Sequence, residues 1–248
     1  MTEPSTLLIT GASGGIGQAL VARLAGGHHH LLLVARDEER LRATAALHSG
    51  CTALAADCTS EAGVHAIGNA LDGLPPLAGF AHLVGSLILK PVHRLQLAEW
   101  RACQATNLDS SFLILRLAVQ RMIAQGSPLA GVFVTSVAAE LGLVNHEAIA
   151  AAKAGLAGLM RAAAATYADK GLRLNAIAPA LTATPLTAGF LASPAAREQL
   201  AARHPLGRIG TPDDQAAAIV WLLSAESSWV TGQVLGVDGG MGTLRPQR

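Results

Sequence analysis

Leu7-Leu8-Ile9-Thr10-Gly11-Ala12-Ser13-Gly14-Gly15-Ile16-Gly17 is the stretch that decides the fold of this chain. Its opening apolar run is typical of a buried strand, and the glycines lead at once into an Ala/Leu-rich helical pattern. Gly11 can take a backbone angle that a Cβ resists, the middle glycines let a pyrophosphate approach the main chain, and Gly17 lets the helix pack closely. The stretch predicts a phosphate-binding turn, with a ligand-free glycine turn as the alternative.

Length and composition favour one domain over residues 1–248. The chain has 248 residues, 51% of them hydrophobic, and no Pro/Ser/Gly-rich linker divides it. A net charge of +1 gives no electrostatic reason to expect nucleic acid or an anionic membrane as a partner. Polar residues or Gly interrupt the apolar stretches well before ~18 residues, and the N-terminus lacks the basic region of a signal peptide. We expect a cytoplasmic protein that acts on a small molecule.

Cysteine and histidine spacing does not indicate a metal site or a disulfide framework. Cys51, Cys58 and Cys103 are odd in number and contain no C-x-x-C pair. The adjacent histidines at 28–30 would point alternately on an extended segment, so they do not easily converge on one ion. We expect reduced, mostly buried thiols and no metal.

Thr10-Gly11-x-x-x-Gly15-Ile16-Gly17 resembles the glycine motif of the short-chain dehydrogenase/reductase family. Strand-like runs alternate with helical patterns along essentially the whole chain, which predicts an α/β fold: a three-layer, Rossmann-type doubly wound parallel sheet of about seven strands. Within the family the chain looks most like 3-oxoacyl carrier-protein reductases, which transfer a hydride from NADPH to a ketone. The resemblance implies cofactor binding by Gly11, Ser13, Gly14, Gly15, Ile16 and Gly17.

The residues after the second and third apolar runs bear on the adenosine half of the cofactor. Arg36 follows the run 30–35. A guanidinium there can bind a 2′-phosphate, so NADP(H) is expected over NAD(H). The alternatives are a surface or capping Arg36, with the adjacent Asp37 as the ribose-binding acid. A third strand over 52–59 places Asp57, and with it Cys58, beside the adenine by resemblance. Capping of a helix over 60–71 is the other role open to Asp57.

The residues expected to bind the nicotinamide half of the cofactor are inferred from the resemblance in two further stretches of the chain. Most relatives carry Asn-Asn-Ala-Gly where this chain has His82-Leu83-Val84-Gly85 after a fourth strand, so only Gly85 is kept to give the backbone room against the ribose. After a sixth strand, the stretch 179–184 matches the loop that holds the nicotinamide amide and phosphate. The implied contacts are Pro179, Leu181, Thr182 and Thr184.

Three candidate catalytic residues match the family pattern. Asn107 interrupts the helical pattern over 97–124, where the family has an Asn that holds a water in a proton relay; an ordinary helix Asn is the alternative. Ser136 ends a fifth strand and matches the substrate-orienting serine. Lys153 matches the lysine of Tyr-x-x-x-Lys, which binds the nicotinamide ribose and lowers the pKa of the tyrosine.

The tyrosine itself is missing, because Ile149 stands at its position. The chain's one tyrosine, Tyr167, lies fourteen residues beyond Lys153, ~21 Å along a helix, and cannot replace it. His146 lies one turn before Ile149 and is a candidate replacement proton donor, with Glu147 less favoured. A plain loop position is the alternative for His146.

The remaining patterns concern a lid, a helix start and the oligomeric state. Residues 186–205 read as an apolar lid, and Thr211-Pro212-Asp213-Asp214 as a strong helix start. Helices over 97–124 and 148–168 are apolar beyond one stripe, which predicts a homotetramer or dimer. We expect an atypical NADP(H)-dependent oxidoreductase acting on a small carbonyl, alcohol or enoyl substrate. The alternative is a catalytically weak NADP(H)-binding subunit or regulatory partner.

Overall fold

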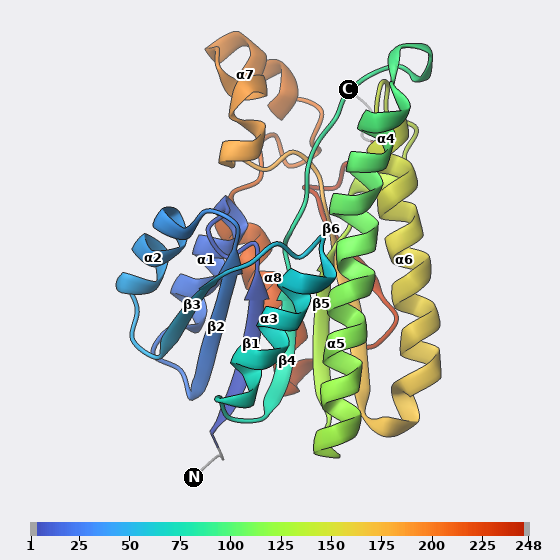
Figure 1. The fold of residues 1–248 in the computed structure, drawn as a ribbon. Coiled ribbons are helices and arrows are strands. Elements are labelled where there is room, and N and C mark those ends of the chain that lie inside the picture. Colours follow the sequence, from blue (N-terminus) through green and yellow to red (C-terminus); the bar gives the residue numbers. More distant parts are fainter. Residues whose placement is uncertain (1–3, 246–248) are drawn as a thin grey trace.

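A parallel sheet of seven strands forms the middle layer of the computed structural model, which describes residues 4–245 (Figure 1). Its order is β3-β2-β1-β4-β5-β6-β7, and all neighbouring strands are parallel. The strands are β1 (Ser5–Thr10), β2 (His29–Ala35), β3 (Cys51–Ala55), β4 (Leu77–His82), β5 (Leu129–Val134), β6 (Leu172–Pro179) and β7 (Val234–Val237). The doubly wound sheet expected from the sequence is confirmed.

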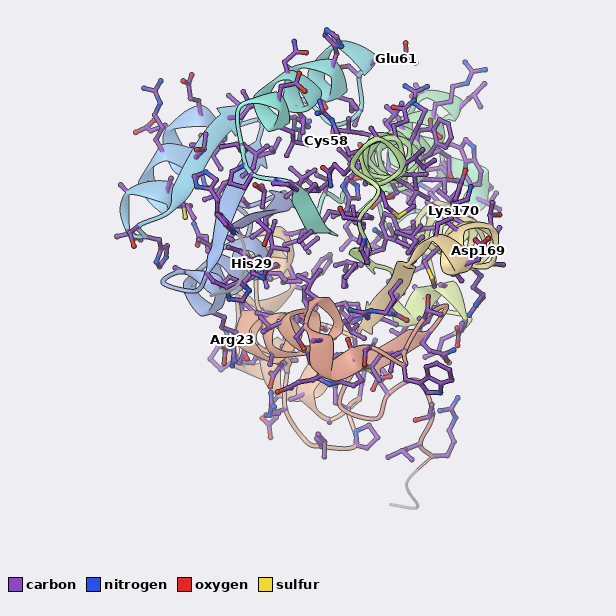
Figure 2. All side chains as sticks on the ribbon, turned by 90° about the horizontal axis from the view of Figure 1, so that it is seen from below. Arg23, His29, Cys58, Glu61, Asp169 and Lys170 are labelled. Atoms are coloured by element: carbon purple, nitrogen blue, oxygen red, sulfur yellow. The ribbon has the colours of Figure 1, made fainter. Side chains whose placement is uncertain are left out.

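Helices cover both faces of this sheet. They are α1 (Gly15–Leu24), α2 (Glu38–Ala46), α3 (Glu61–Asp72), α4 (Leu97–Gln104), α5 (Ser110–Gln125), α6 (Glu147–Tyr167), α7 (Pro194–Ala201) and α8 (Pro212–Leu223). Figure 2 looks along the strands from below and shows the layers, with Glu61 of α3 on one side of the sheet and Arg23 of α1 on the other. In Figure 1, α7 stands apart from these layers, beyond the edge at which the strands end.

Alternate residues of β1 supply the two halves of the core. Leu8 packs in one cluster with Phe80, Phe133 and residues of α3, α5 and α6. Leu7 and Ile9 pack in the other cluster with residues of α1 and α8. Burial on both faces explains why the first two strands are continuous apolar runs.

The helical pattern expected over 97–124 is α4 and α5 joined by a π-helical turn, Ala105–Asp109. Asn107 Nδ2 donates to the Cys103 carbonyl oxygen at 2.9 Å, and the Ser110 hydroxyl donates to the carbonyl oxygen four residues earlier at 2.7 Å. Such side-chain bonds compete with the regular helical ladder. The expected interruption is thus present as one π turn, a geometry common at functional sites.

The third strand is shorter than the expected 52–59, because β3 ends at Ala55. The Asp57 carboxylate accepts from the backbone N–H of Thr59 at 2.9 Å and closes a turn there. Ser60, and not Asp57, caps α3, since its hydroxyl oxygen accepts from the Gly63 N–H at 3.1 Å. The capping role considered for Asp57 is therefore wrong.

The lid segment contains helices that the sequence analysis did not predict, and the helix start predicted after it is present. The insertion 186–205 is a 3₁₀ helix, Pro185–Leu191, followed by α7. The start predicted for α8 is confirmed as a capping box: the Thr211 hydroxyl oxygen accepts from the Asp214 N–H at 3.2 Å, and the Asp214 carboxylate accepts from the Thr211 N–H at 2.7 Å.

Helix α6 is apolar beyond what the sequence analysis allowed. Glu147–Lys170, with a mean hydropathy of 1.3, is by length and composition alone long and apolar enough to cross a membrane. Its inner face contributes Leu156, Met160 and Ala164 to the core beside β6. Packing on the sheet therefore accounts for that half of the helix.

Candidate active site

The sheet changes winding direction between β1 and β4, and the glycine motif lies at that point. Gly11 follows β1 with a φ of +74°, and a Cβ there would lie 2.8 Å from the Leu83 carbonyl carbon. Any other residue would be strained and would collide with the chain leaving β4. Ligands of doubly wound sheets bind at such a switch point, outside the carboxyl ends of the strands.

Helix α1 starts with its N–H groups open to a ligand. Its N-cap, Gly14, offers no side-chain cap. A Cβ on Gly17 would lie 2.4 Å from the Gly11 carbonyl oxygen, so a glycine lets α1 begin this close to the strand. A Cβ on Gly15 would lie 3.0 Å from Thr184 Cγ2, and would fill the space between this turn and the loop after β6. The cradle fits the pyrophosphate of a dinucleotide.

The residues expected at the adenosine end lie beyond β2 and β3. Arg36 is exposed and close enough to Asp57 to help lower the pKa of that carboxyl, although the hydrogen bond from the Thr59 N–H is the larger cause. Burial raises the pKa of the Cys58 thiol to about 12, so it stays protonated. Asp37 caps α2, because its carboxylate accepts from the Arg40 N–H at 3.0 Å.

Arg40 is a residue that sequence reasoning missed. Its guanidinium donates to the Ser13 carbonyl oxygen at 3.1 Å and so ties α2 to the glycine motif. The signal was an Arg four residues after Arg36, in the first turn of the helix that follows β2. Arg36 and Arg40 therefore both follow β2, and Arg40 contacts the glycine motif.

A pocket of about 640 Å³ opens at the carboxyl edge of the sheet. The expected site residues that line it are Ile16, Gly85, Asn107, Ser136, His146, Lys153, Pro179, Leu181, Thr182 and Thr184. Those outside its wall, toward the ends of β1, β2 and β3, are Gly11, Ser13, Gly14, Gly15, Gly17, Arg36, Asp57 and Cys58. The structure thus brings the expected nicotinamide and catalytic residues together in one pocket.

Asn107 holds the backbone beside Gly85. Its Oδ1 accepts from the Ser86 N–H at 3.2 Å, and its Nδ2 donates to the Ser86 hydroxyl at 3.0 Å. A Cβ on Gly85 would lie 3.2 Å from that Oδ1 and 3.8 Å from Lys153 Nζ. The glycine thus keeps a gap between the Asn107 amide and the Lys153 amine.

Lys153 is buried and points back at the sheet. Its Nζ donates to the Val134 carbonyl oxygen at 2.8 Å. Burial lowers the pKa of Lys153 to about 8, against a smaller opposite effect of the Cys103 thiol. Ser136 follows β5 at the same edge, and its hydroxyl oxygen accepts from the Ala138 N–H at 3.1 Å. The hydroxyl hydrogen of Ser136 is left to donate to a substrate oxygen.

Ile149, at the position matched by resemblance to the family's tyrosine, occupies an apolar site on the pocket wall. The side chain is 4% exposed and packs with Cys103, Leu87 and Trp100. His146 occupies the N-cap position of α6 without a side-chain capping bond and lines the pocket, with Nδ1 donating to the Val144 carbonyl oxygen at 2.7 Å. Glu147 turns elsewhere, since its carboxylate accepts from the Val92 N–H at 3.1 Å. His146 is therefore the better placed of the two candidate donors.

His82 builds a polar network behind the site that the sequence did not reveal. Its Nδ1 lies 2.7 Å from the Thr10 hydroxyl and its Nε2 3.0 Å from the Ser110 hydroxyl. Because Ser110 already donates to the Thr106 carbonyl, it accepts from Nε2–H, which leaves Nδ1 to accept from Thr10. Burial, and secondly the charge of Lys153, lower the pKa of His82 to about 3. A neutral imidazole thus joins β1, β4 and α5.

The loop after β6 has its polar groups arranged around the pocket. The Leu181 carbonyl oxygen accepts from the Gly210 N–H at 3.0 Å. The Thr182 hydroxyl donates to the Ala180 carbonyl oxygen at 3.2 Å and accepts from Gln215. These bonds fix the loop that faces the glycine motif.

The lid contributes two basic residues that no sequence motif indicated. Arg203 and His204 follow α7 and line the pocket. His204 is 2% exposed, donates from Nδ1 to the Leu200 carbonyl oxygen at 3.0 Å, and has no hydrogen-bond partner at Nε2 within residues 4–245. Only the docking of α7 over the sheet edge makes these residues part of the site.

Comparisons with known proteins agree with this geometry. The family model adh_short_C2, described as enoyl-(acyl carrier protein) reductase, matches residues 11–242. The chain is 38% identical over 244 residues to cis-4-hydroxycyclohexanecarboxylate dehydrogenase of Sinomonas cyclohexanicum, covering 94% of each chain. It is 33% identical over 207 residues to inactive 2-(S)-hydroxypropyl-CoM dehydrogenase 2 of Xanthobacter autotrophicus, covering 81% of this chain and 89% of that protein. A solved actinorhodin polyketide ketoreductase with NADPH superposes with a TM-score of 0.93 at 25% identity, covering 98% of this chain and 100% of that one. This chain belongs to the short-chain dehydrogenase/reductase family of NAD(P)-dependent oxidoreductases that act on alcohol and carbonyl groups.

Proposed function

We propose that this protein interconverts a small secondary alcohol and its ketone with NADP(H), and that it does so without the family's phenol. The observation that carries the proposal is that Asn107, Ser136 and Lys153 line one pocket at the switch point of the sheet. A ring-bearing substrate fits the largely apolar wall, and the similar protein of Sinomonas cyclohexanicum is named for a ring alcohol. The nicotinamide, when bound, supplies or accepts the hydride.

The preference for NADP(H) is supported by the charges beyond β2. Arg36 is exposed there and Arg40 is tied to Ser13 beside it. Asp37, the acid that would otherwise bind ribose hydroxyls, is engaged as the cap of α2. A planar donor fork fits a phosphate, and a capping carboxylate is less available to a ribose.

The proton in this scheme comes from His146 or from water. With Nδ1 donating to Val144, the His146 Nε2 is the atom left to exchange a proton at the pocket wall. Ser136 orients the substrate oxygen, and Lys153 holds the ribose side of the site. An enoyl thioester, which is protonated at carbon, is a second substrate class that does not need a phenol.

The test is NADPH consumption with cyclic ketones, aldehydes and enoyl thioesters, alongside Lys153→Met and Ser136→Ala variants. Turnover of a ketone that both variants lose supports the proposal. Tight NADPH binding without turnover of any carbonyl would refute it.

A second candidate is a cofactor-binding subunit with little chemistry of its own. The observation that favours it is Ile149, which is buried in an apolar cluster and leaves no hydroxyl at the position of the family's proton donor. One similar protein is itself named as inactive. Co-purification with an active family member, combined with no turnover alone, would support this candidate.

For its surroundings we propose a cytoplasmic protein with a small-molecule substrate and neither nucleic acid nor membrane as a partner. The near-neutral net charge of +1 supports this. We further propose that the protein is a homotetramer or dimer.

A further inference from the structure

We infer that the substrate carries a carboxylate, and that Arg203 binds it at the lid end of the pocket, away from the reacting carbonyl. The inference rests on the proposed function, because it concerns the substrate of that same site. It assigns a specificity role to a residue outside the catalytic group.

The first argument is the sign of the charges on the pocket wall. The titratable side chains that line it within residues 4–245 are His146, Lys153, Arg203 and His204, and no Asp or Glu is among them. A partly enclosed, apolar wall weakens the screening of these charges. Such a site favours an anion over a neutral or cationic molecule of the same shape.

The second argument is that other partners already account for two of the four basic groups. Lys153 is buried and donates to Val134, beside the space for the cofactor ribose. His146 donates to Val144 and lies next to Ile149 at the start of α6. Of the two lid residues, His204 is hydrogen-bonded at Nδ1 but not at Nε2, and the Arg203 side chain has no partner within residues 4–245.

Arg203 is free to take a ligand. The exposed arginines that pair with acids in this chain are Arg23, Arg42, Arg116 and Arg208. Arg203 forms no side-chain hydrogen bond or ion pair with any described residue. Beside it, the Nε2 of His204 is buried without a partner, so a second polar atom at this wall also lacks a ligand. A planar guanidinium matches the two oxygens of a carboxylate.

The segment that carries Arg203 is held in place. The N–H of Arg203 and the Nδ1 of His204 both donate to the Leu200 carbonyl oxygen, at 3.2 and 3.0 Å. Three residues on, the Leu206 N–H donates to the Gly239 carbonyl oxygen at 3.0 Å, which ties the lid to the C-terminal segment. The guanidinium is therefore presented from a fixed turn, as a binding residue needs.

The other residues that line the pocket indicate the polarity of the rest of the substrate. Leu143 and, from the lid itself, Leu186, Phe190 and Leu200 also line the pocket. An apolar middle with an oxygen-binding group at one end and a guanidinium at the other fits a compact oxo acid or hydroxy acid. Phosphate groups of the cofactor are the other anions that Arg203 could meet, so the test separates the two sources.

The experiment compares wild type, Arg203→Gln, Arg203→Lys and the control Arg197→Gln, an exposed arginine of α7 that does not line the pocket. The substrates are 4-oxocyclohexanecarboxylate and its primary amide, with linear 5-oxohexanoate and its amide as a second pair. Calorimetric titration of cyclohexanecarboxylate and cyclohexanecarboxamide into the NADP⁺-loaded protein measures recognition without turnover. Titration of NADPH measures cofactor affinity.

In wild type, we expect the carboxylate to be preferred over the amide in both kcat/KM and affinity. Arg203→Gln should reduce this preference ~10–100-fold, mainly through KM, as expected for a lost charge-assisted hydrogen bond. Arg203→Lys should restore part of it, and Arg197→Gln should leave it unchanged.

Three results would overturn the inference: no wild-type preference for the carboxylate, an equal loss for acid and amide, or weaker NADPH binding in Arg203→Gln with the carboxylate preference kept. If the proposed function is wrong, turnover will be absent for both acids and amides. The calorimetric comparison of cyclohexanecarboxylate with its amide would still test Arg203 in that case.

Discussion

At the scale of single residues, the proposal that this chain works without a phenol is tested at Ile149. It lies four residues before Lys153 on α6 and lines the same pocket, so a tyrosine there would face the lysine one turn away. We expect Ile149→Tyr to raise the turnover of a simple ketone by ~10²–10⁴, the usual contribution of a positioned general acid. Initial rates with saturating NADPH measure this.

Ile149→Phe is the matched control for that change, because it adds the ring without the hydroxyl. His146→Ala should abolish the wild-type rate if His146 is the donor, and should do little in Ile149→Tyr. The opposite outcome is a wild type that reduces ketones as fast as tyrosine-bearing relatives, with no effect of His146→Ala. That result would contradict both the predicted loss of rate without the phenol and the assignment of His146 as its replacement.

Arg36 decides the choice of cofactor in this reading. Removing its guanidinium takes away a charge-assisted contact to the 2′-phosphate and leaves the contacts to the rest of the cofactor. Arg36→Ala should therefore lower the ratio of NADPH to NADH affinity by ~10–100-fold. Fluorescence titration of both cofactors gives the ratio. Arg42→Ala, which removes an exposed arginine paired with Glu38, serves as the control. An unchanged ratio in Arg36→Ala would reject the assignment.

At the scale of elements, His82 links β1, β4 and α5 through Thr10 and Ser110. Its folded-state pKa of about 3 lies below the unfolded value of 6.5. The unfolded chain therefore binds a proton on this ring at a pH where the folded chain does not. Stability falls as the pH drops below about 6.5, with a slope approaching ~1.4 kcal/mol per pH unit for this group.

His82→Asn removes the titration while it keeps a donor and an acceptor at the site. Between pH 7 and pH 5 we expect wild type to lose about 2 kcal/mol more unfolding free energy than the variant. Urea unfolding followed by far-UV circular dichroism at the two pH values measures the difference. Equal losses in the two proteins would mean that His82 titrates normally in the fold.

Elements that depend on local pattern were predictable from the sequence, and contacts across the chain were not. The runs that form β1 and β2 and the cap of α8 are set by neighbouring residues, so their positions followed directly. Asn107 signalled a break in a helix, but nothing local indicated its hydrogen bonds to Ser86, which is twenty-one residues away. The role of His82 depends on Thr10, which is seventy-two residues away. No period or spacing rule reports such pairs.

The same holds for the candidate site. Glycine, lysine and serine positions could be matched to a motif, because the motif fixes their spacing. Arg40 and Arg203 belong to no such motif. Arg40 reaches the glycine loop only through the packing of α2, and Arg203 joins the pocket wall only because the lid folds as α7 over the sheet edge.

At the scale of the whole molecule, the outer faces of α5 and α6 expose apolar and small residues beside Arg116 and Arg161. The two helices lie side by side on one flank of the molecule (Figure 1). Phe112 and Ile123 of α5 are 46% and 55% exposed, and the exposed stripe of α6 includes Ala154, Gly158 and Ala162. Monomers rarely leave such a surface to water, and small residues let a second helix approach closely.

We therefore predict a homodimer or homotetramer that uses this flank. Gly158 is the sharpest probe of it, because a Cβ there would have no atom within 4 Å, so a larger residue fits the isolated chain. Gly158→Arg should leave the far-UV circular dichroism unchanged but block the approach of a second copy. Ala43→Arg on the exposed side of α2 is the control. Light scattering after gel filtration should give a multiple of 25.3 kDa for wild type and Ala43→Arg, and a smaller assembly for Gly158→Arg. A wild-type mass near 25.3 kDa at micromolar concentration, or an assembly unaffected by Gly158→Arg, would show that this flank is not the interface.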